Sequence, residues 1–237
     1  MSYAKPPVLN GSAKSDYENY LRTDELLSLQ GGPANWLHRD ELLFTVVHQV
    51  SELWLKLATS EILEATEKLE LNELREAQRL LNRAILCILQ TRESLELLET
   101  MSPWDYQQVR RALGHGSGFD SPGFNSVRLS IPRLGKEFFK ILREQDLELM
   151  QVFKLERKYE DLYQLAELLL TLDEAVSLWR AKHIKVVART IGIQSVGTQG
   201  TPVEDLMKLS EFTFFPLLWD IRNQITELAT QGEKSSS

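Results

Sequence analysis

The chain contains four histidines, the side chains best suited to metal binding and acid–base chemistry near neutral pH: His38, His48, His115 and His183. Apolar residues recur with the helical period around His48, so Phe44, His48 and Glu52 share one face of a predicted helix. A histidine on such a face is either a core residue with satisfied ring nitrogens or a residue directed into a cofactor or substrate pocket. The spacing alone leaves both interpretations open.

His183 lies in a second predicted helix, four residues after Trp179. The basic residues around it are Arg180, Lys182, Lys185 and Arg189. These cations suit the propionates of a haem, and they suit a solvated helix face near a C-terminus equally well. If the two histidine-bearing helices face each other, a flat cofactor fits between them, with one histidine bound to iron and the other across the site.

Other common kinds of active site leave no motif in the sequence. The CxxC, HExxH, P-loop and GxSxG patterns are all absent. Cys87 is the only cysteine, so an internal disulfide is excluded, and the count suits a reducing cytoplasm. We expect Cys87 to be a small buried residue of an amphipathic helix.

Composition sets the broad class of protein. The 237 residues suffice for one large domain or two small ones, and 43% hydrophobic residues support a substantial core. A net charge of −7 argues against a general nucleic-acid binder. No leader pattern opens the sequence, and no apolar run approaches the roughly 18 residues of a membrane span. We therefore expect a cytoplasmic protein without nucleic-acid or membrane partners.

Hydrophobic periodicity predicts an all-α fold, a helical bundle that encloses the site between long helices. The predicted helices begin at Ser15 or Asp16, at 35 and at 72, and then at 103, 132, 152, 173 and 203, the last being bent or restarted near Pro216. Those starting at 35 and 72 run to about 70 and 100, and the later ones from 132 end near 150, 171, 191 and 228. We expect one helical domain over 16–230, a flexible arm over 1–15 and a disordered tail over 231–237.

Local signals mark several boundaries. Ser102, Pro103 and Asp105 combine a serine cap, a proline at the first helical position and an acid in the first turn. Gly192 predicts a helix C-terminus. The segment 114–123 holds four glycines and a proline, so its exposed backbone N–H groups form either a plain connection or a close approach to a ligand.

Five segments occur in order along most of the chain. They are Tyr17–Leu21 with Asp24–Ser28; Asp40–Phe44 running into His48–Trp54; Tyr106, Arg110 and Leu113 with Ser117–Ser121; Leu178–Arg180 with His183 and Arg189–Gly192; and Phe212–Pro216 with Asp220 and Arg222. Together they resemble the tryptophan 2,3-dioxygenase family, an all-helical group of haem enzymes. One such segment carries little information, whereas five in the same order form a specific signal.

The resemblance implies a haem b site in which His183 is the axial ligand of the iron. It places Trp179, Arg180, Ser117 and Gly118 at the cofactor. The backbone N–H of Gly118 would lie near dioxygen, the co-substrate.

The resemblance also implies the substrate contacts. His48 would accept a hydrogen bond from the indole N–H on the distal side, and Phe44 would pack on the indole. Arg110 would pair with the substrate carboxylate, a task that suits its planar guanidinium. Tyr106 would help to wall the pocket, and Thr198 would bind the ammonium and carboxylate end.

The family's quaternary structure makes a further set of residues part of the site. Tyr17, Tyr20 and Leu21 would reach from an N-terminal helix into the pocket of a neighbouring subunit. The resemblance therefore implies a homotetramer.

Three features depart from the family pattern. The loop Ser195–Pro202 replaces a glycine-rich closing loop, and Thr198 aligns with that loop only after one inserted residue. His115 stands between two glycines where the family usually has no histidine. The stretch between Arg110 and His183 is shorter than in the family.

The activity implied is that of an oxidoreductase in tryptophan catabolism by the kynurenine pathway. Dioxygen would be added across the indole C2–C3 bond of L-tryptophan or a close indole derivative, giving an N-formylkynurenine-type product. One alternative is a haem monooxygenase that hydroxylates a tryptophan or tyrosine derivative. A second is a non-haem iron protein that uses His48, His183 and Glu52, and a third is a helical scaffold without catalytic activity.

Overall fold

The computed structural model describes residues 8–11, 13–200, 202–203 and 212–235. Regular structure within these residues is helical, apart from one isolated antiparallel bridge between Val196 and Pro202. The predicted all-α fold is therefore confirmed. None of the described helices is long and apolar enough to cross a membrane.

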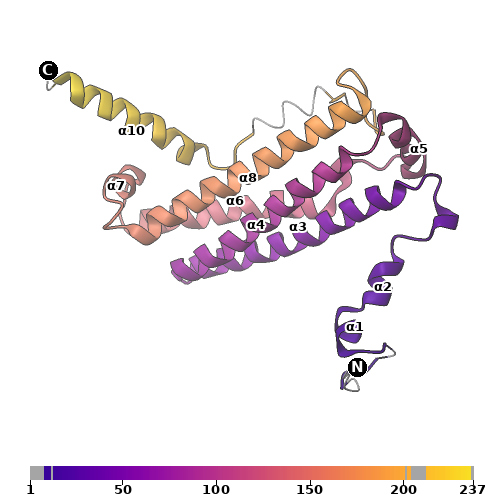
Figure 1. Cartoon of the computed structure of the whole chain (residues 1–237). Coiled ribbons are helices and arrows are strands. Elements are labelled where there is room, and N and C mark those ends of the chain that lie inside the picture. The colour runs from indigo at the N-terminus through magenta and orange to yellow at the C-terminus, as the bar shows by residue number, and fades with distance from the viewer. Residues whose placement is uncertain (1–7, 12, 201, 204–211, 236–237) are drawn as a thin grey trace, which may run out of the picture.

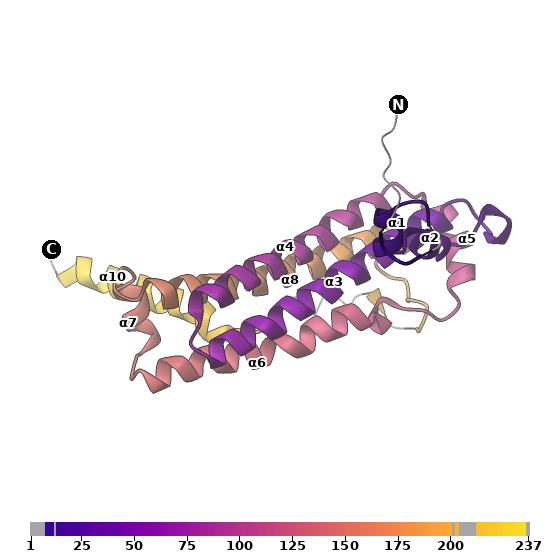
Figure 2. The same cartoon turned by 90° about the horizontal axis from the view of Figure 1, so that it is seen from below.

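Four long helices form the body of the molecule: α3 (Glu41–Glu70), α4 (Leu74–Leu98), α6 (Pro122–Glu144) and α8 (Glu160–Ile191). They lie side by side along the length of the molecule (Figures 1 and 2), with α3 packed against α4 and α6, and α8 packed against α4. Their shared core includes fully buried side chains from each helix: Ile62, Leu81, Phe138 and Leu169. Burial of such side chains is the main source of stability for a bundle.

Shorter elements lie at the two ends of the bundle (Figure 1). Helix α5 (Pro103–Leu113) lies at the same end as the loop that follows α8, and α7 (Leu149–Lys154) lies at the opposite end. Helix α10 (Pro216–Ser235) starts beside the middle of α8 and extends past the α7 end. Helices α1 (Asp16–Leu21) and α2 (Thr23–Ser28) extend away from the body and bury none of their residues.

The start of α6 differs from the sequence prediction by ten residues. The helix begins at Pro122, where the hydroxyl of Ser121 accepts the N–H of Phe124, and not at Pro132. Proline occupies the first helical position at 122 and a helix interior position at 132. Because Pro132 has no N–H, the helix lacks one internal hydrogen bond there, which the tertiary packing of this long helix tolerates. Residues 122–131 thus belong to a helix that lines the site.

Helix α8 joins the larger part of the helix predicted over 152–171 to the helix predicted over 173–191, whereas residues 152–154 belong to α7 and 155–159 form a turn. The prediction treated Asp173 as a helix start, but its side chain is buried and serves a distant segment. Its carboxylate accepts the backbone N–H groups of Phe214 and Phe215, at 3.0 and 3.1 Å, and the indole N–H of Trp219 at 3.0 Å. Asp173 therefore fixes the start of α10, a role that depends on tertiary contacts.

The remaining boundaries differ by smaller amounts. Helix α3 begins at Glu41, because residues 33–35 form a separate 3-10 turn. Arg22 adopts a left-handed conformation with φ of 53° and divides α1 from α2, while Ser15 caps α1 as expected. Helix α10 continues to Ser235, beyond the predicted end at 228.

The predicted division into arm, domain and tail stays a prediction. Residues 1–7, 12, 201, 204–211 and 236–237 lie outside the described residues, and they include parts of the arm, the tail and the helix predicted from 203.

Candidate active site

A cavity of about 630 Å³ opens at the α5 end of the bundle. Its walls come from α3, α5, α6, α8 and the loop after α8. This volume lies within the range of about 300–1,000 Å³ that is typical of cofactor and small-molecule sites. Three arginines line it, Arg110, Arg128 and Arg180, and no Asp or Glu does so among the described residues. The cavity is therefore positively charged in a chain whose net charge is −7.

His183 lies in the wall formed by α8, one turn after Trp179. Burial lowers the pKa of His183 to about 4, and the nearby His48 acts in the same direction. The imidazole is therefore neutral near pH 7, which is the form that binds a metal. Gly118 approaches this ring closely, because a Cβ at that glycine would lie 3.4 Å from Cε1 and 3.5 Å from Nε2 of His183.

His48 lines the same cavity from α3, four residues after Phe44. The two rings lie 4.0 Å apart between centroids, and His48 Nδ1 lies 2.7 Å from the carbonyl oxygen of Phe44. Because a carbonyl oxygen only accepts, Nδ1 carries the proton and Nε2 is left as an acceptor. Burial lowers the pKa of His48, against smaller opposing effects of the Phe44 hydrogen bond and the Glu52 charge. Solvent still reaches the ring through the cavity.

Helix α5 contributes Tyr106 and Arg110, which are spaced by one turn and both line the cavity. The ring of Tyr106 lies 6.2 Å from that of Phe44 between centroids, so α3 and α5 face each other across the site. Arg110 Nη2 donates a hydrogen bond of 3.0 Å to the carbonyl oxygen of Val196. The guanidinium is thus held at the cavity by the loop that follows α8.

The loop after α8 closes one side of the cavity. The hydroxyl of Thr198 donates to the carbonyl oxygen of Gly116, and the amide of Gln199 donates to the carboxylate of Asp120 at 2.7 Å. These bonds join the loop to the segment between α5 and α6. Thr198 lines the cavity, and its role at the substrate's polar end stays a prediction.

The predicted cofactor residues Ser117, Gly118, Trp179 and Arg180 all line the cavity. The hydroxyl of Ser117 also accepts the N–H of Phe119 at 3.3 Å, so it caps the short 3-10 helix Gly118–Asp120. Arg180 Nη1 donates to the carbonyl oxygen of Phe212 at 3.2 Å. Its guanidinium also faces the aromatic rings of Phe124, Phe212 and Phe214. The structure therefore brings together every predicted site residue of the helical body.

Three predicted residues lie elsewhere. Tyr17, Tyr20 and Leu21 on α1 have exposed fractions of 69%, 77% and 45%, and none lines this chain's own cavity. Their role in a neighbouring subunit stays a prediction.

Glu52 does not serve the non-haem iron alternative. Its carboxylate accepts the hydroxyl of Ser121 and the N–H of Gly123, the latter at 2.8 Å, and so holds the start of α6 against α3. A Cβ at Gly123 would lie 2.5 Å from the Glu52 carboxylate, so this contact requires glycine. Within the described part of the chain, no group of three His, Cys, Asp or Glu residues is placed to hold a metal ion.

Some cavity residues were missed by the sequence analysis. Phe124 and Arg128 lie one turn apart on α6, and Phe124 stacks on Trp179 with centroids 4.3 Å apart. The signal was present, because Ser121 followed by Pro122 is a helix start, and a helix from 122 places Phe124 and Arg128 on one face. Choosing Pro132 as the start concealed this face.

The fold and the site together define an all-helical protein in which two histidines from different helices line one positively charged cavity. The family model for tryptophan 2,3-dioxygenase matches residues 3–137. The tryptophan 2,3-dioxygenase of Serratia proteamaculans (strain 568) is 30% identical over 269 positions, covering 92% of this chain and 96% of that protein. That of Bacillus cereus (strain ATCC 10987 / NRS 248) is 30% identical, covering 88% and 92%, and that of Arthrobacter sp. (strain FB24) is 31% identical, covering 93% and 95%. The chain belongs to the tryptophan 2,3-dioxygenase family.

The alignment with the Serratia protein spans 269 positions, more than the 237 residues of this chain. That relative therefore contains residues that have no counterpart here.

Proposed function

We propose that the protein is a haem-dependent dioxygenase that adds both atoms of dioxygen across the indole C2–C3 bond of L-tryptophan. The observation that carries the proposal is the shared cavity lined by His48 and His183, in a chain whose relatives are named tryptophan 2,3-dioxygenase. Both imidazoles are neutral near pH 7, so one is available to iron and the other to a hydrogen-bond donor.

The residues around the cavity suit haem b. His183 would bind the iron, and the flat apolar rings of Phe124 and Trp179 would border the macrocycle. The indole N–H of Trp179 is buried without a hydrogen-bond partner among the described residues, and such an orphaned donor favours a bound group that satisfies it. Arg128 and Arg180 would pair with the two propionates.

The count of charges supports this assignment. Haem b carries two carboxylates and tryptophan carries one, which equals the number of arginines in the cavity wall. Burying carboxylates is costly unless cations pair with them. Arg128 and Arg180 are close enough for their charges to interact, whereas Arg110 lies on α5, so Arg110 would bind the amino acid.

When bound, the haem supplies the iron at which dioxygen is activated; the protein orients tryptophan and excludes water. Phe44 would pack on the indole, and Tyr106 would close the opposite wall. Nε2 of His48 would accept the indole N–H and so fix the rotation of the ring. Gly118 would present its backbone N–H toward the haem cavity.

The carboxylate of tryptophan would take over the Arg110 guanidinium from the carbonyl oxygen of Val196. A carboxylate is the stronger acceptor, and two parallel hydrogen bonds are available to it. Thr198 on the same loop would then contact the ammonium and carboxylate end, so binding and loop position are linked.

The proposed assembly is a homotetramer located in the cytoplasm. Helices α1 and α2, together with the segment that follows them, expose six large apolar residues: Tyr17, Tyr20, Leu21, Leu26, Leu27 and Leu29. Such a density of exposed apolar side chains favours a protein partner. Insertion of Tyr17, Tyr20 and Leu21 into a neighbour's cavity would cover them.

The test combines an absorption spectrum with the mass of the product. Purified protein reconstituted with haem should show a Soret band and convert L-tryptophan to a product heavier by two oxygen atoms. A product heavier by one oxygen atom would identify a monooxygenase, and a haem-free spectrum after reconstitution would refute the proposal.

A further inference from the structure

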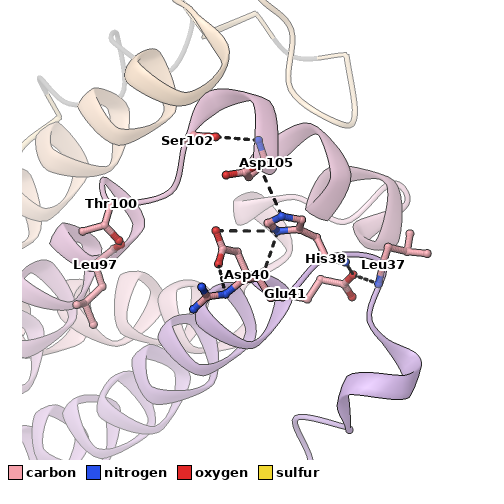
Figure 3. A network of polar contacts seen from close by, with 9 residues as sticks. Leu37, His38, Asp40, Glu41, Leu97, Thr100, Ser102 and Asp105 are labelled. Atoms are coloured by element: carbon pink, nitrogen blue, oxygen red, sulfur yellow. Dashed lines mark hydrogen bonds and ion pairs between the residues drawn. The ribbon is translucent and has the colours of Figure 1, made fainter.

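His38 lies between two carboxylates at the junction of α3 and α5 (Figure 3). Its Nε2 lies 3.6 Å from Oδ1 of Asp105 at the start of α5, and its Nδ1 lies 4.0 Å from Oδ2 of Asp40 before α3. The imidazole does not line the cavity, so none of the binding roles proposed above involves it.

The imidazole is fixed firmly on the α3 side. One carboxylate oxygen of Glu41 accepts the backbone N–H groups of Leu37 and His38, the latter at 2.9 Å, and the N–H of Asp40 donates to His38 Nδ1 at 3.2 Å. Because a backbone N–H donates to Nδ1, Nδ1 is an acceptor and the ring proton resides on Nε2. That N–H faces Asp105.

The α5 side is also locally fixed. The hydroxyl of Ser102 accepts the N–H of Asp105 at 3.1 Å, which anchors the first turn of the helix. Asp105 immediately precedes Tyr106 and lies five residues before Arg110. A displacement of this turn is therefore transmitted through one short, rigid helix to the guanidinium at the cavity.

Few other contacts set the position of α5 relative to α3. The helix buries one residue, Val109, and within the described chain it packs chiefly against α8. Toward α3, the described contacts of α5 include the tilted Phe44–Tyr106 ring pair, with centroids 6.2 Å apart, and the polar contact between Asp105 and His38.

We propose that His38 and Asp105 form a positioning pair that sets the separation of α5 from α3, and through it the placement of Arg110 toward the substrate carboxylate. This role presupposes the proposed function, because it is a role in binding an amino acid. The pair touches neither substrate nor cofactor.

Two substitutions test the pair in the haem-loaded full chain. His38→Asn retains a side-chain oxygen that accepts an N–H two residues on, as asparagine does in turns, but removes the N–H that faces Asp105. Asp105→Asn removes the negative charge of the carboxylate that faces His38 Nε2. Each should raise the KM for L-tryptophan by about threefold to tenfold, the effect of one polar contact. The kcat and the haem content should each change by less than about twofold.

Tryptamine, which lacks the carboxylate, separates positioning of Arg110 from general damage. Its dissociation constant, from the change in the haem spectrum, should differ little between wild type and variants. The double variant should have about the KM of either single variant, since coupled residues are not additive. Arg111→Gln, on the exposed face of α5, is the matched control and should leave KM unchanged.

Three outcomes would refute the positioning pair. These are an unchanged KM in both single variants, a KM in the double variant raised by the product of the two single effects, or a loss of tryptamine affinity equal to the loss for L-tryptophan. If one single variant does not fold, the other decides. Wild-type protein without haem binding or tryptophan turnover would refute the proposed function itself, whereas an active wild type with unaffected variants refutes the positioning pair alone.

Discussion

The indole ring of Trp179 and the imidazole ring of His183 lie parallel, with an interplanar angle of 3° and centroids 5.3 Å apart. The two residues are one turn apart on α8, so the helix itself sets their spacing. The ring of Phe124 from α6 stacks on the same indole. Rings from two helices thus restrict the direction in which the imidazole points, which would suit the proposed bond from His183 to iron.

His183→Ala should fold but purify without stoichiometric haem, because the substitution removes the proposed bond between iron and protein. The measurement is Soret absorbance per chain after reconstitution, with circular dichroism to verify the helices. His115→Ala, in the loop outside the cavity, is the control and should retain haem. An unchanged Soret band in His183→Ala would refute the assignment of His183 as the iron ligand.

The helical periodicity was sufficient to predict the long helices of the bundle and to place His48 and His183 on two of them. The prediction went wrong at Pro132 and Asp173, which carry local signals for a helix start but lie inside α6 and α8. At both positions tertiary packing prevails over local preference.

The grouping of the site residues depends on contacts that no local pattern contains. Glu52 capping α6 and Arg110 bonding to the loop after α8 each join residues more than 60 positions apart in sequence. The family resemblance supplied the roles of His48, Arg110 and His183, whereas Arg128 was recognised once the geometry placed it in the cavity wall.

Trp179→Phe should affect the haem-free and haem-loaded chains differently. In the free chain the substitution removes a buried N–H without a described partner, which destabilises the fold by roughly 1–3 kcal/mol. This gain in stability offsets the packing that is lost with the smaller ring. In the loaded chain the same N–H would have gained a partner, so the variant should lose stability there. Urea unfolding with and without haem measures both effects, and equal changes in the two states would contradict the proposed contact.

Arg128→Gln should weaken the binding of haem by about tenfold or more, because a charged hydrogen bond contributes roughly 1.5–3 kcal/mol. Haem dimethyl ester has no carboxylates, so its affinity should be the same in wild type and variant. Arg133→Gln is the matched control, because Arg133 lies on the same helix as Arg128 and loses only an exposed ion pair with Glu70 at the end of α3. An equal loss of both porphyrins would show that Arg128 acts through packing.

Arg110→Lys should weaken L-tryptophan binding far more than a substitution that keeps the charge normally does. A point charge cannot form the two parallel hydrogen bonds of a guanidinium. The loss of one charged hydrogen bond amounts to about 1.5–3 kcal/mol, or roughly ten- to a hundredfold in the dissociation constant. Tryptamine should bind the variant and the wild type equally, and discrimination between them by tryptamine would exclude the carboxylate role.

His48→Ala should retain haem and lose turnover with L-tryptophan, because the proposed iron ligand is His183 and not His48. The Nδ1 proton of His48 is committed to the Phe44 carbonyl, so Nε2 is the acceptor that the indole N–H would use. 1-Methyl-L-tryptophan has no indole N–H, and its turnover should fall by a smaller factor. Both substrates occupy one cavity, so damage to packing largely cancels in the comparison.

Haem content and the two turnover rates of His48→Ala together separate three roles for this histidine. Loss of haem would make it an iron ligand, and loss of the fold would make it a core residue. Retained haem with equal fractional losses for the two substrates would count against the hydrogen bond, even if activity fell steeply. Retained haem with a larger loss for L-tryptophan is the result expected of an acceptor for the indole N–H, and its size should match one hydrogen bond, about 0.5–1.5 kcal/mol or roughly two- to thirteenfold.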